Sequence, residues 1–251
     1  SPSGGGRLCA YFLASARLLK YDSGTDMKRI SLIVPCLNEE EAIPAFKQEI
    51  DRVFKECLEG YAPELIFVDD GSTDRSLEMI KKMAEHSPEV KFISFSRNFG
   101  KEAAIYAGLE AATGDYAAVM DVDLQDPPSL LPDMLKAIEK EGYDCAGTRR
   151  VTRQGEPLLR SFFARAFYKT IHQISDTRIV DGARDYKLMT RPVLEALLSL
   201  KEYNRFSKGL YEWVGFRTKW FEYENVERVA GETKWSFFKL FLYSIEGIVA
   251  F

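Results

Sequence analysis

From Met27 onward, short apolar segments alternate with segments whose apolar residues recur at helical spacing, and this alternation constrains the fold most strongly. Strands are expected at 30–35, 65–68, 90–95 and 116–120, and helices at 39–58, 74–84, 101–112 and 130–140. Such alternation predicts an α/β fold, with a mainly parallel sheet flanked by helices on both faces.

Acidic residues follow two of the expected strands directly. Asp69 and Asp70 come after one strand, and Asp121 and Asp123 after another. Sheets of this kind bind ligands beyond the carboxyl ends of their strands. Because an unpaired charge is costly to bury, this recurrence is not typical of core positions, and it predicts a functional site there.

Composition excludes several classes of function. The net charge of −4 gives no support to a nucleic-acid partner, so none is expected. Only two histidines are present, and the four cysteines form no metal-ligand spacing, which argues against a zinc site and favours reduced thiols. No run of 18 apolar residues occurs, so no segment of this chain is expected to span a bilayer.

The two ends of the chain differ in character from its middle. Residues 1–26 are interpreted as a tag, linker or disordered extension, because Met27 directly before a strand pattern resembles a natural start. At the other end, residues 235–251 are largely apolar with one narrow polar stripe. That pattern fits a core helix of a soluble domain, but we favour an amphipathic helix at a membrane interface or against transmembrane segments farther along.

A basic, aromatic segment lies at 149–169. It carries six basic residues against one acid, Glu156, with Phe, Leu and Tyr between them. A solvated amphipathic helix and a surface that faces anionic lipid are both compatible with this pattern.

The segment Asp121-Val122-Asp123 can hold one divalent cation between two carboxylates. A lone pair at this spacing is weak evidence, so rival uses were compared with the sequence. An EF-hand loop would need Gly and Glu where the chain has Asp126 and Pro132, and Gln125 does not fit a dehalogenase-type phosphatase. Mg²⁺ or Mn²⁺ bridging a diphosphate is the remaining interpretation.

Taken together, several segments resemble family 2 glycosyltransferases with the GT-A fold. Within that family the chain is similar to polyprenyl-phosphate glycosyltransferases, a group that includes bactoprenol glucosyltransferases and dolichol-phosphate mannose synthases. The resemblance covers nearly everything from Met27 to the end, and it is carried by Pro35–Glu39, Val68–Asp74, Arg97–Lys101, Asp121–Pro128, Asp185–Met189, Asn204–Phe206 and Arg228–Trp235.

This resemblance implies a role for each matching position. Residues expected to bind the nucleotide sugar are Pro35, Leu37, Glu39, Asp69, Asp121, Arg149 and Arg205. Residues expected to hold the metal are Asp121, Asp123 and Gln125. Residues expected to take part in catalysis are Asp123, Asp185, Arg228 and Lys234. Asp185 is expected near the sugar and acceptor, as a base or a positioning group, and Asp126 is expected to support its loop.

The resemblance also implies the overall activity and its setting. We expect inverting transfer of a hexose, with UDP-glucose as the first choice of donor, to polyprenyl phosphate at the cytoplasmic face of the cell membrane. A catalytic domain is expected over 27–232 and a juxtamembrane helix over 233–251, with transmembrane helices missing from this chain. Other donors (GDP-mannose, UDP-N-acetylglucosamine or a modified UDP-pentose), a non-lipid acceptor and assembly into homo-oligomers stay open.

Other classes fit the sequence less well. A processive polysaccharide synthase would carry Gln-x-x-Arg-Trp, which none of the three tryptophans has. A dinucleotide-binding oxidoreductase would need Gly-x-Gly-x-x-Gly after the first strand, where the chain has Pro35–Glu39. A binding module without catalysis is disfavoured because the acidic and basic motifs are intact.

Overall fold

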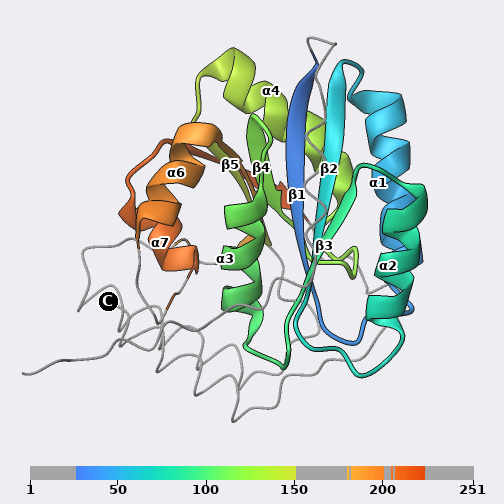
Figure 1. Cartoon of the computed structure of the whole chain (residues 1–251). Helices are drawn as coiled ribbons and strands as arrows, with labels where there is room; N and C mark the ends of the chain where they lie inside the picture. Colours follow the sequence, from blue (N-terminus) through green and yellow to red (C-terminus); the bar gives the residue numbers. More distant parts are fainter. Residues whose placement is uncertain (1–26, 151–179, 181, 201–204, 206, 224–251) are drawn as a thin grey trace, which may run out of the picture.

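A computed structural model describes residues 27–150, 180, 182–200, 205 and 207–223. They contain one seven-stranded sheet in the order β3-β2-β1-β4-β6-β5-β7 (Figure 1). The strands are β1 (Lys28–Cys36), β2 (Tyr61–Asp69), β3 (Val90–Ser94), β4 (Tyr116–Val119), β5 (Cys145–Arg150), β6 (Ala183–Thr190) and β7 (Thr218–Tyr223).

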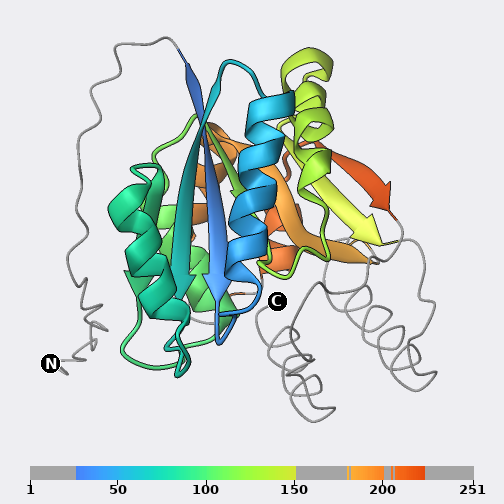
Figure 2. The same cartoon turned by 90° about the vertical axis from the view of Figure 1, so that its right-hand side faces the viewer.

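Helices cover both faces of this sheet, as the alternation predicts. Ile30, Leu32 and Val34 point to the face covered by α1 (Ile43–Cys57), α2 (Ser76–His86), the short 3₁₀ helix η1 (Pro128–Leu130) and α4 (Leu131–Glu141). Ile33 points to the other face, covered by α3 (Lys101–Ala111), α6 (Arg191–Ser199) and α7 (Ser207–Trp213). The alternation of β1 side chains between two buried layers follows from the period of two in a strand, and Figure 2 shows the layers from the side.

Strand directions confirm the mainly parallel sheet, with one exception. β1 pairs in parallel with β2 and β4, and β2 with β3. β6 runs antiparallel to both β4 and β5, so the sheet is mixed. The sequence pattern predicts no strand after residue 120, so β5, β6 and β7 were not expected.

Two expected helices begin later than predicted. α1 starts at Ile43 rather than Glu39, because the Glu39 carbonyl first closes a turn by accepting the N–H groups of Ala42 and Ile43. α2 starts at Ser76, and its N-cap is Arg75 rather than Asp74. The Asp74 carboxylate still accepts the Ser76 N–H, at 2.9 Å.

Several predictions fall on residues outside the described ranges. These are the extension at 1–26, the basic aromatic segment beyond Arg150 and the interfacial helix at 233–251. Within the described ranges, no helix has the length and apolar character needed to cross a bilayer.

Candidate active site at the carboxyl ends of the central strands

β2, β1 and β4 lie side by side, so the loops that follow them meet at one edge of the sheet. β6 enters the same edge from the opposite direction. Tyr116 pairs with Thr190 and Val119 pairs with Lys187, and continuing this register by two residues brings Asp185 opposite Asp121. The antiparallel direction of β6 thus places Asp185 next to the Asp121–Asp123 segment.

Lys101, the first residue of α3, joins these two carboxylates. Its Nζ lies 2.6 Å from Asp121 Oδ1 and 2.5 Å from Asp185 Oδ2, and Lys208 Nζ lies 3.7 Å from Asp185 Oδ1. Burial lowers the pKa of Lys101, but the two carboxylates outweigh burial and raise it. Burial likewise opposes ionisation of Asp185, yet Lys101 and Lys208 hold its pKa below the usual range. Asp185 is therefore an anion at neutral pH and a poor proton acceptor in this state.

The loop before α3 is held in place by Asp70. Its carboxylate accepts the backbone N–H groups of Phe99 at 2.6 Å and Gly100 at 3.0 Å. Gly71 lies so close to this loop that a Cβ there would come within 2.6 Å of the Arg97 carbonyl carbon. Asp70 is thus more than a turn residue, because it fixes the backbone from which Lys101 projects.

Asp69, expected near the nucleoside, is buried at the end of β2. Its carboxylate accepts the Ser72 N–H at 3.2 Å and the Ser94 hydroxyl at 3.3 Å. Pro35 pairs with Val68 at the end of β1, and Leu37 follows that strand directly. The structure therefore places Pro35, Leu37 and Asp69 at neighbouring strand ends.

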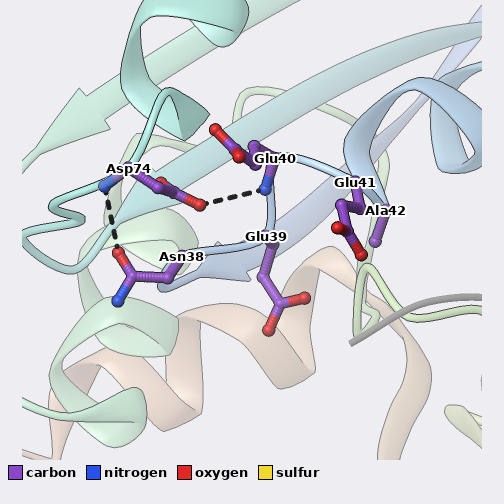
Figure 3. A pocket seen from close by; sticks show the side chains of 6 residues that line it. All are labelled: Asn38, Glu39, Glu40, Glu41, Ala42 and Asp74. Atoms are coloured by element: carbon purple, nitrogen blue, oxygen red, sulfur yellow. Dashed lines mark hydrogen bonds between the residues drawn. The ribbon is translucent and has the colours of Figure 1, made fainter. Parts of the chain in front are cut away.

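The loops after β1 and β2 form an acidic pocket, shown in Figure 3. Its lining consists of Asn38, Glu39, Glu40, Glu41, Ala42 and Asp74. Asn38 has a positive φ of 52°, and its side-chain oxygen accepts the Thr73 N–H at 2.7 Å. The Asp74 carboxylate accepts the Glu40 N–H at 3.3 Å, and the Ser76 hydroxyl accepts the Glu39 N–H at 2.7 Å. These cross-links hold Glu39 at the pocket wall.

The Asp121–Asp123 segment turns sharply after β4. Leu124 has a positive φ of 57°, and the Asp123 carboxylate accepts the Gln125 N–H at 3.1 Å. Asp126 is 1% exposed and binds Arg184 Nε at 3.0 Å and the Tyr223 hydroxyl, so it supports the loop as predicted.

The donor set of this segment suits a hard divalent cation. Asp121 and Asp123 supply carboxylate oxygens, and the Gln125 amide can supply a third oxygen. Across the described ranges, no group of three or more His, Cys, Asp or Glu side chains is placed to hold a metal ion. A metal here would therefore complete its shell with oxygens of the amide, water or a bound diphosphate.

The basic residues expected at the site differ in their contacts, and two of them are not described. Arg149, at the end of β5, is ion-paired with Glu222. Arg205 instead donates to the carbonyls of Leu200 and Leu197 and stacks 4.5 Å from the Tyr106 ring, which ties the end of α6 to α3. Arg228 and Lys234 lie outside the described residues.

Sequence reasoning missed three cations of the site: Lys101, Lys208 and Arg184. Lys101 stood in a segment that carried the family resemblance, but without a role. Its position at the start of a helix that follows a strand end was the available signal. Arg184 and Lys208 belong to elements that the alternation pattern did not reveal.

Comparison with known proteins gives matches over most of the chain. The profile of Glycosyl transferase family 2 matches residues 31–198. The protein CsbB of Bacillus subtilis (strain 168) is 45% identical over 222 residues, which are 88% of this chain and 66% of CsbB. A prophage bactoprenol glucosyl transferase homolog of Escherichia coli (strain K12) is 42% identical over 89% of this chain and 72% of its own length. The chain thus spans about two thirds of these relatives.

Solved structures share the fold at low sequence identity. Glucosyl-3-phosphoglycerate synthase from Mycobacterium tuberculosis, in complex with Mn²⁺ and UDP-glucose, gives a TM-score of 0.55 at 20% identity, over 89% of this chain and 77% of that one. The mannosyltransferase PcManGT from Pyrobaculum calidifontis, in complex with GDP-mannose and Mn²⁺, gives 0.53 at 21% identity, over 82% and 58%. By the extent of the family match and the identity to its relatives, the chain belongs to Glycosyl transferase family 2.

Proposed function

We propose that this chain transfers a hexose from a nucleotide diphosphate sugar, UDP-glucose first, to polyprenyl phosphate. The observation that carries the proposal is the meeting of Asp121 and Asp185 at the carboxyl ends of the strands, with Lys101 between them and Asp123 two residues after Asp121. The relatives named bactoprenol glucosyl transferase support the choice of sugar and acceptor, at 42% identity. A lipid acceptor would place the enzyme at a membrane surface, and a UDP-sugar donor would place it on the cytoplasmic side.

The nucleoside would bind against Pro35, Leu37, Glu39 and Asp69. These residues lie at the ends of β1 and β2 or in the loop after β1, which the Asn38 contacts hold against the loop after β2. Asp121, Asp123 and Gln125 would hold Mg²⁺ or Mn²⁺ at the donor diphosphate. When bound, the metal supplies positive charge for the departing nucleotide diphosphate.

The acceptor needs little activation. A phosphate monoester has a second pKa near 6, so most of it is already an oxyanion at neutral pH. The chain's task is then to position two anions in line, for attack at the anomeric carbon with inversion. Asp185, held as an anion by Lys101 and Lys208, suits sugar positioning better than proton abstraction.

Positive charge for the acceptor phosphate would come from basic side chains. Arg149, Arg228 and Lys234 are our candidates, because guanidinium forks bind phosphate oxygens in pairs and an ammonium adds a point charge. Arg205 would act indirectly, by holding α6 against α3.

A transfer assay tests the proposal. Purified protein is incubated with radiolabelled UDP-glucose, undecaprenyl phosphate in detergent and Mn²⁺. We expect a labelled lipid with inverted anomeric configuration, abolished by EDTA and strongly reduced in Asp185→Asn. Labelled lipid from GDP-mannose alone would keep the reaction and replace the sugar. Absence of transfer from every nucleotide sugar to lipid, in protein that binds the donor, would contradict the acceptor assignment.

A further inference from the structure

Lys101 occupies a position that a divalent ion would also need. Its Nζ is at hydrogen-bond distance, 2.6 Å, from Asp121 Oδ1, one of the carboxylate oxygens proposed for the metal. Mg²⁺ lies about 2.0–2.1 Å from its oxygen ligands. An ammonium and a divalent ion on the same carboxylate would therefore stand only a few ångströms apart, where like charges repel strongly.

The remaining charges nearby leave little surplus for a free cation. Four carboxylates of the described residues gather around the Asp121 loop: Asp121, Asp123, Asp126 and Asp185. Within the described part of the chain, three side-chain cations contact Asp121, Asp126 or Asp185. Lys101 bridges Asp121 and Asp185, Lys208 pairs with Asp185, and Arg184 pairs with Asp126 and feels the charge of Asp121. Asp121 and Asp185 thus already have cationic partners among the described residues, so a divalent ion arriving alone at Asp121 would meet a carboxylate whose charge is already offset.

An arriving nucleotide diphosphate changes this balance. It brings negative charge with the metal, and it offers Lys101 a new anionic partner at the start of α3. The backbone N–H groups at a helix start also favour an anion. Asp185, at 2.5 Å, can retain Lys101 when Asp121 is given up.

We propose that Lys101 is a tethered cation that competes with the divalent metal for Asp121, so that the metal binds well only together with a nucleotide diphosphate. This inference rests on the proposed metal site at Asp121 and Asp123. It adds that the metal and the nucleotide diphosphate bind to that site together. Lys101 holds Asp121 in the free protein, and it yields that carboxylate when the donor and metal arrive together. The arrangement keeps the acidic site from binding free metal ions ahead of the donor.

Manganese titrations followed by electron paramagnetic resonance test the proposal without any turnover. Free Mn²⁺ is measured for the wild type and Lys101→Met, each with and without UDP. Methionine keeps most of the length of the side chain and removes its charge. We expect Lys101→Met to bind Mn²⁺ at least about tenfold more tightly than the wild type in the absence of UDP, because a competing charge is gone. The factor by which UDP tightens Mn²⁺ binding should be smaller in Lys101→Met than in the wild type.

Two further variants separate competition at Asp121 from a general effect of charge. Lys208→Met removes a positive charge that contacts Asp185 at 3.7 Å and should tighten Mn²⁺ binding much less. Lys101→Arg keeps the charge and should bind Mn²⁺ as weakly as the wild type, which also covers a loss of folding in the Met variant. Circular dichroism verifies the fold of each protein.

Three results would overturn the inference. In the first, a folded Lys101→Met binds Mn²⁺ no more tightly than the wild type. In the second, Lys208→Met tightens binding as much as Lys101→Met. In the third, Lys101→Arg binds more tightly than the wild type. If none of the proteins binds Mn²⁺ even with UDP, the metal site itself is wrong, a failure distinct from these three.

Discussion

Lys101 is partly exposed and Lys187 is buried, and their surroundings shift the pKa values of the two lysines in opposite directions. Lys101 lies between two carboxylates, which raise its pKa against the effect of burial. Lys187, in the middle of β6, is 2% exposed and lies between the rings of Tyr211 and Trp220, with Glu212 at 3.2 Å. Burial lowers the pKa of Lys187, although Glu212 opposes the shift. The first lysine belongs to a site, and the second fills space between a sheet and α7.

Volume should therefore matter more than charge at Lys187. We expect Lys187→Met to change the free energy of unfolding by less than about 1 kcal/mol, because burial disfavours the lysine charge, methionine fills most of the same space, and the Glu212 carboxylate stays 22% exposed to water. Lys187→Ala should lose about 2–4 kcal/mol through the cavity it leaves. Urea unfolding compares the two variants. Equal losses in both would show that the ion pair, rather than the packing, stabilises this region.

Gly71 is required by both its backbone and its surroundings. Its φ is +76°, and an added Cβ would meet the backbone of Arg97 and Asn98 at 2.6–2.7 Å. Gly60 has a similar φ of +89° with nothing within 4 Å of the added Cβ. We expect Gly71→Ala to lose at least about 1 kcal/mol more unfolding free energy than Gly60→Ala, because only Gly71 adds a clash to the strain. Equal losses in urea unfolding would contradict the close approach.

At this scale the sequence predicted residue types better than contacts. Asp121, Asp123 and Asp185 were identified from motifs, and the structure brings Asp121 and Asp185 together. Lys101 was not given a role because its partners lie 20 and 84 positions away, and only the antiparallel register of β6 brings Asp185 within its reach. Arg205 was predicted from the same motifs, but its contacts are to carbonyls of α6.

Among the secondary-structure elements, α4 is joined to three strands through one side chain. Glu139 accepts hydrogen bonds at 2.7 Å from Lys28 of β1, Tyr61 of β2 and Tyr116 of β4. Burial raises the pKa of Glu139, but these three donors outweigh it and lower the pKa to about 2. The carboxylate is therefore more stable in the folded protein than in the unfolded chain.

This shift predicts how stability depends on pH. Because the folded pKa is lowered, the contribution of Glu139 is fully present above its usual pKa of 4.5 and is lost as pH falls toward about 2. We expect Glu139→Gln to lower the free energy of unfolding by about 1–2 kcal/mol at pH 7. The difference in unfolding free energy between this variant and the wild type should narrow as pH falls from 4.5 toward about 2. Glu141→Gln, which removes a more exposed pair with Lys219, should cost less than about 1 kcal/mol. If the difference in unfolding free energy between Glu139→Gln and the wild type stays constant between pH 7 and 2, this account is contradicted.

The first four strands and helices could be predicted because each has its own periodicity and boundaries. The apolar positions expected on the first helix, Ile43, Phe46, Ile50, Val53 and Phe54, are the buried residues of α1. β5, β6 and β7 could not be predicted in the same way. Thr148 and the ion-paired Arg149 interrupt the apolar pattern of β5, and buried Lys187 interrupts that of β6, so these two strands depend on tertiary partners.

For the whole molecule, stability and the site occupy different ends of the sheet. The buried Glu64 carboxylate, toward the amino ends of the strands, accepts from the Ser31 hydroxyl, from Lys91 at 2.5 Å, and from the Thr113 N–H and hydroxyl. These contacts link β1, β2, β3 and the segment before β4. The acidic site lies at the carboxyl ends, where its charges face a ligand rather than the core.

Because Glu64 and the acidic site lie at opposite ends of the strands, we expect a mutation of Glu64 to affect stability but not donor binding. Glu64→Gln should lower the unfolding free energy by about 2–4 kcal/mol, because Lys91 loses its charged partner and the network loses an acceptor. The dissociation constant for UDP-glucose, measured well below the unfolding temperature, should not change. Weaker donor binding by folded Glu64→Gln would show that the two ends are coupled.

The most direct measurement is a calorimetric titration of UDP-glucose into wild-type protein and Asp123→Asn, with Mn²⁺ and with EDTA. Asp115→Asn is the matched control, because Asp115 is exposed at the amino end of β4 and contacts the Arg29 N–H. We predict binding to the wild type and Asp115→Asn that requires Mn²⁺, and binding to Asp123→Asn that is at least about tenfold weaker, as loss of a charged metal ligand implies. Equal, Mn²⁺-independent binding by all three proteins would contradict a metal-assisted transferase site at this edge of the sheet.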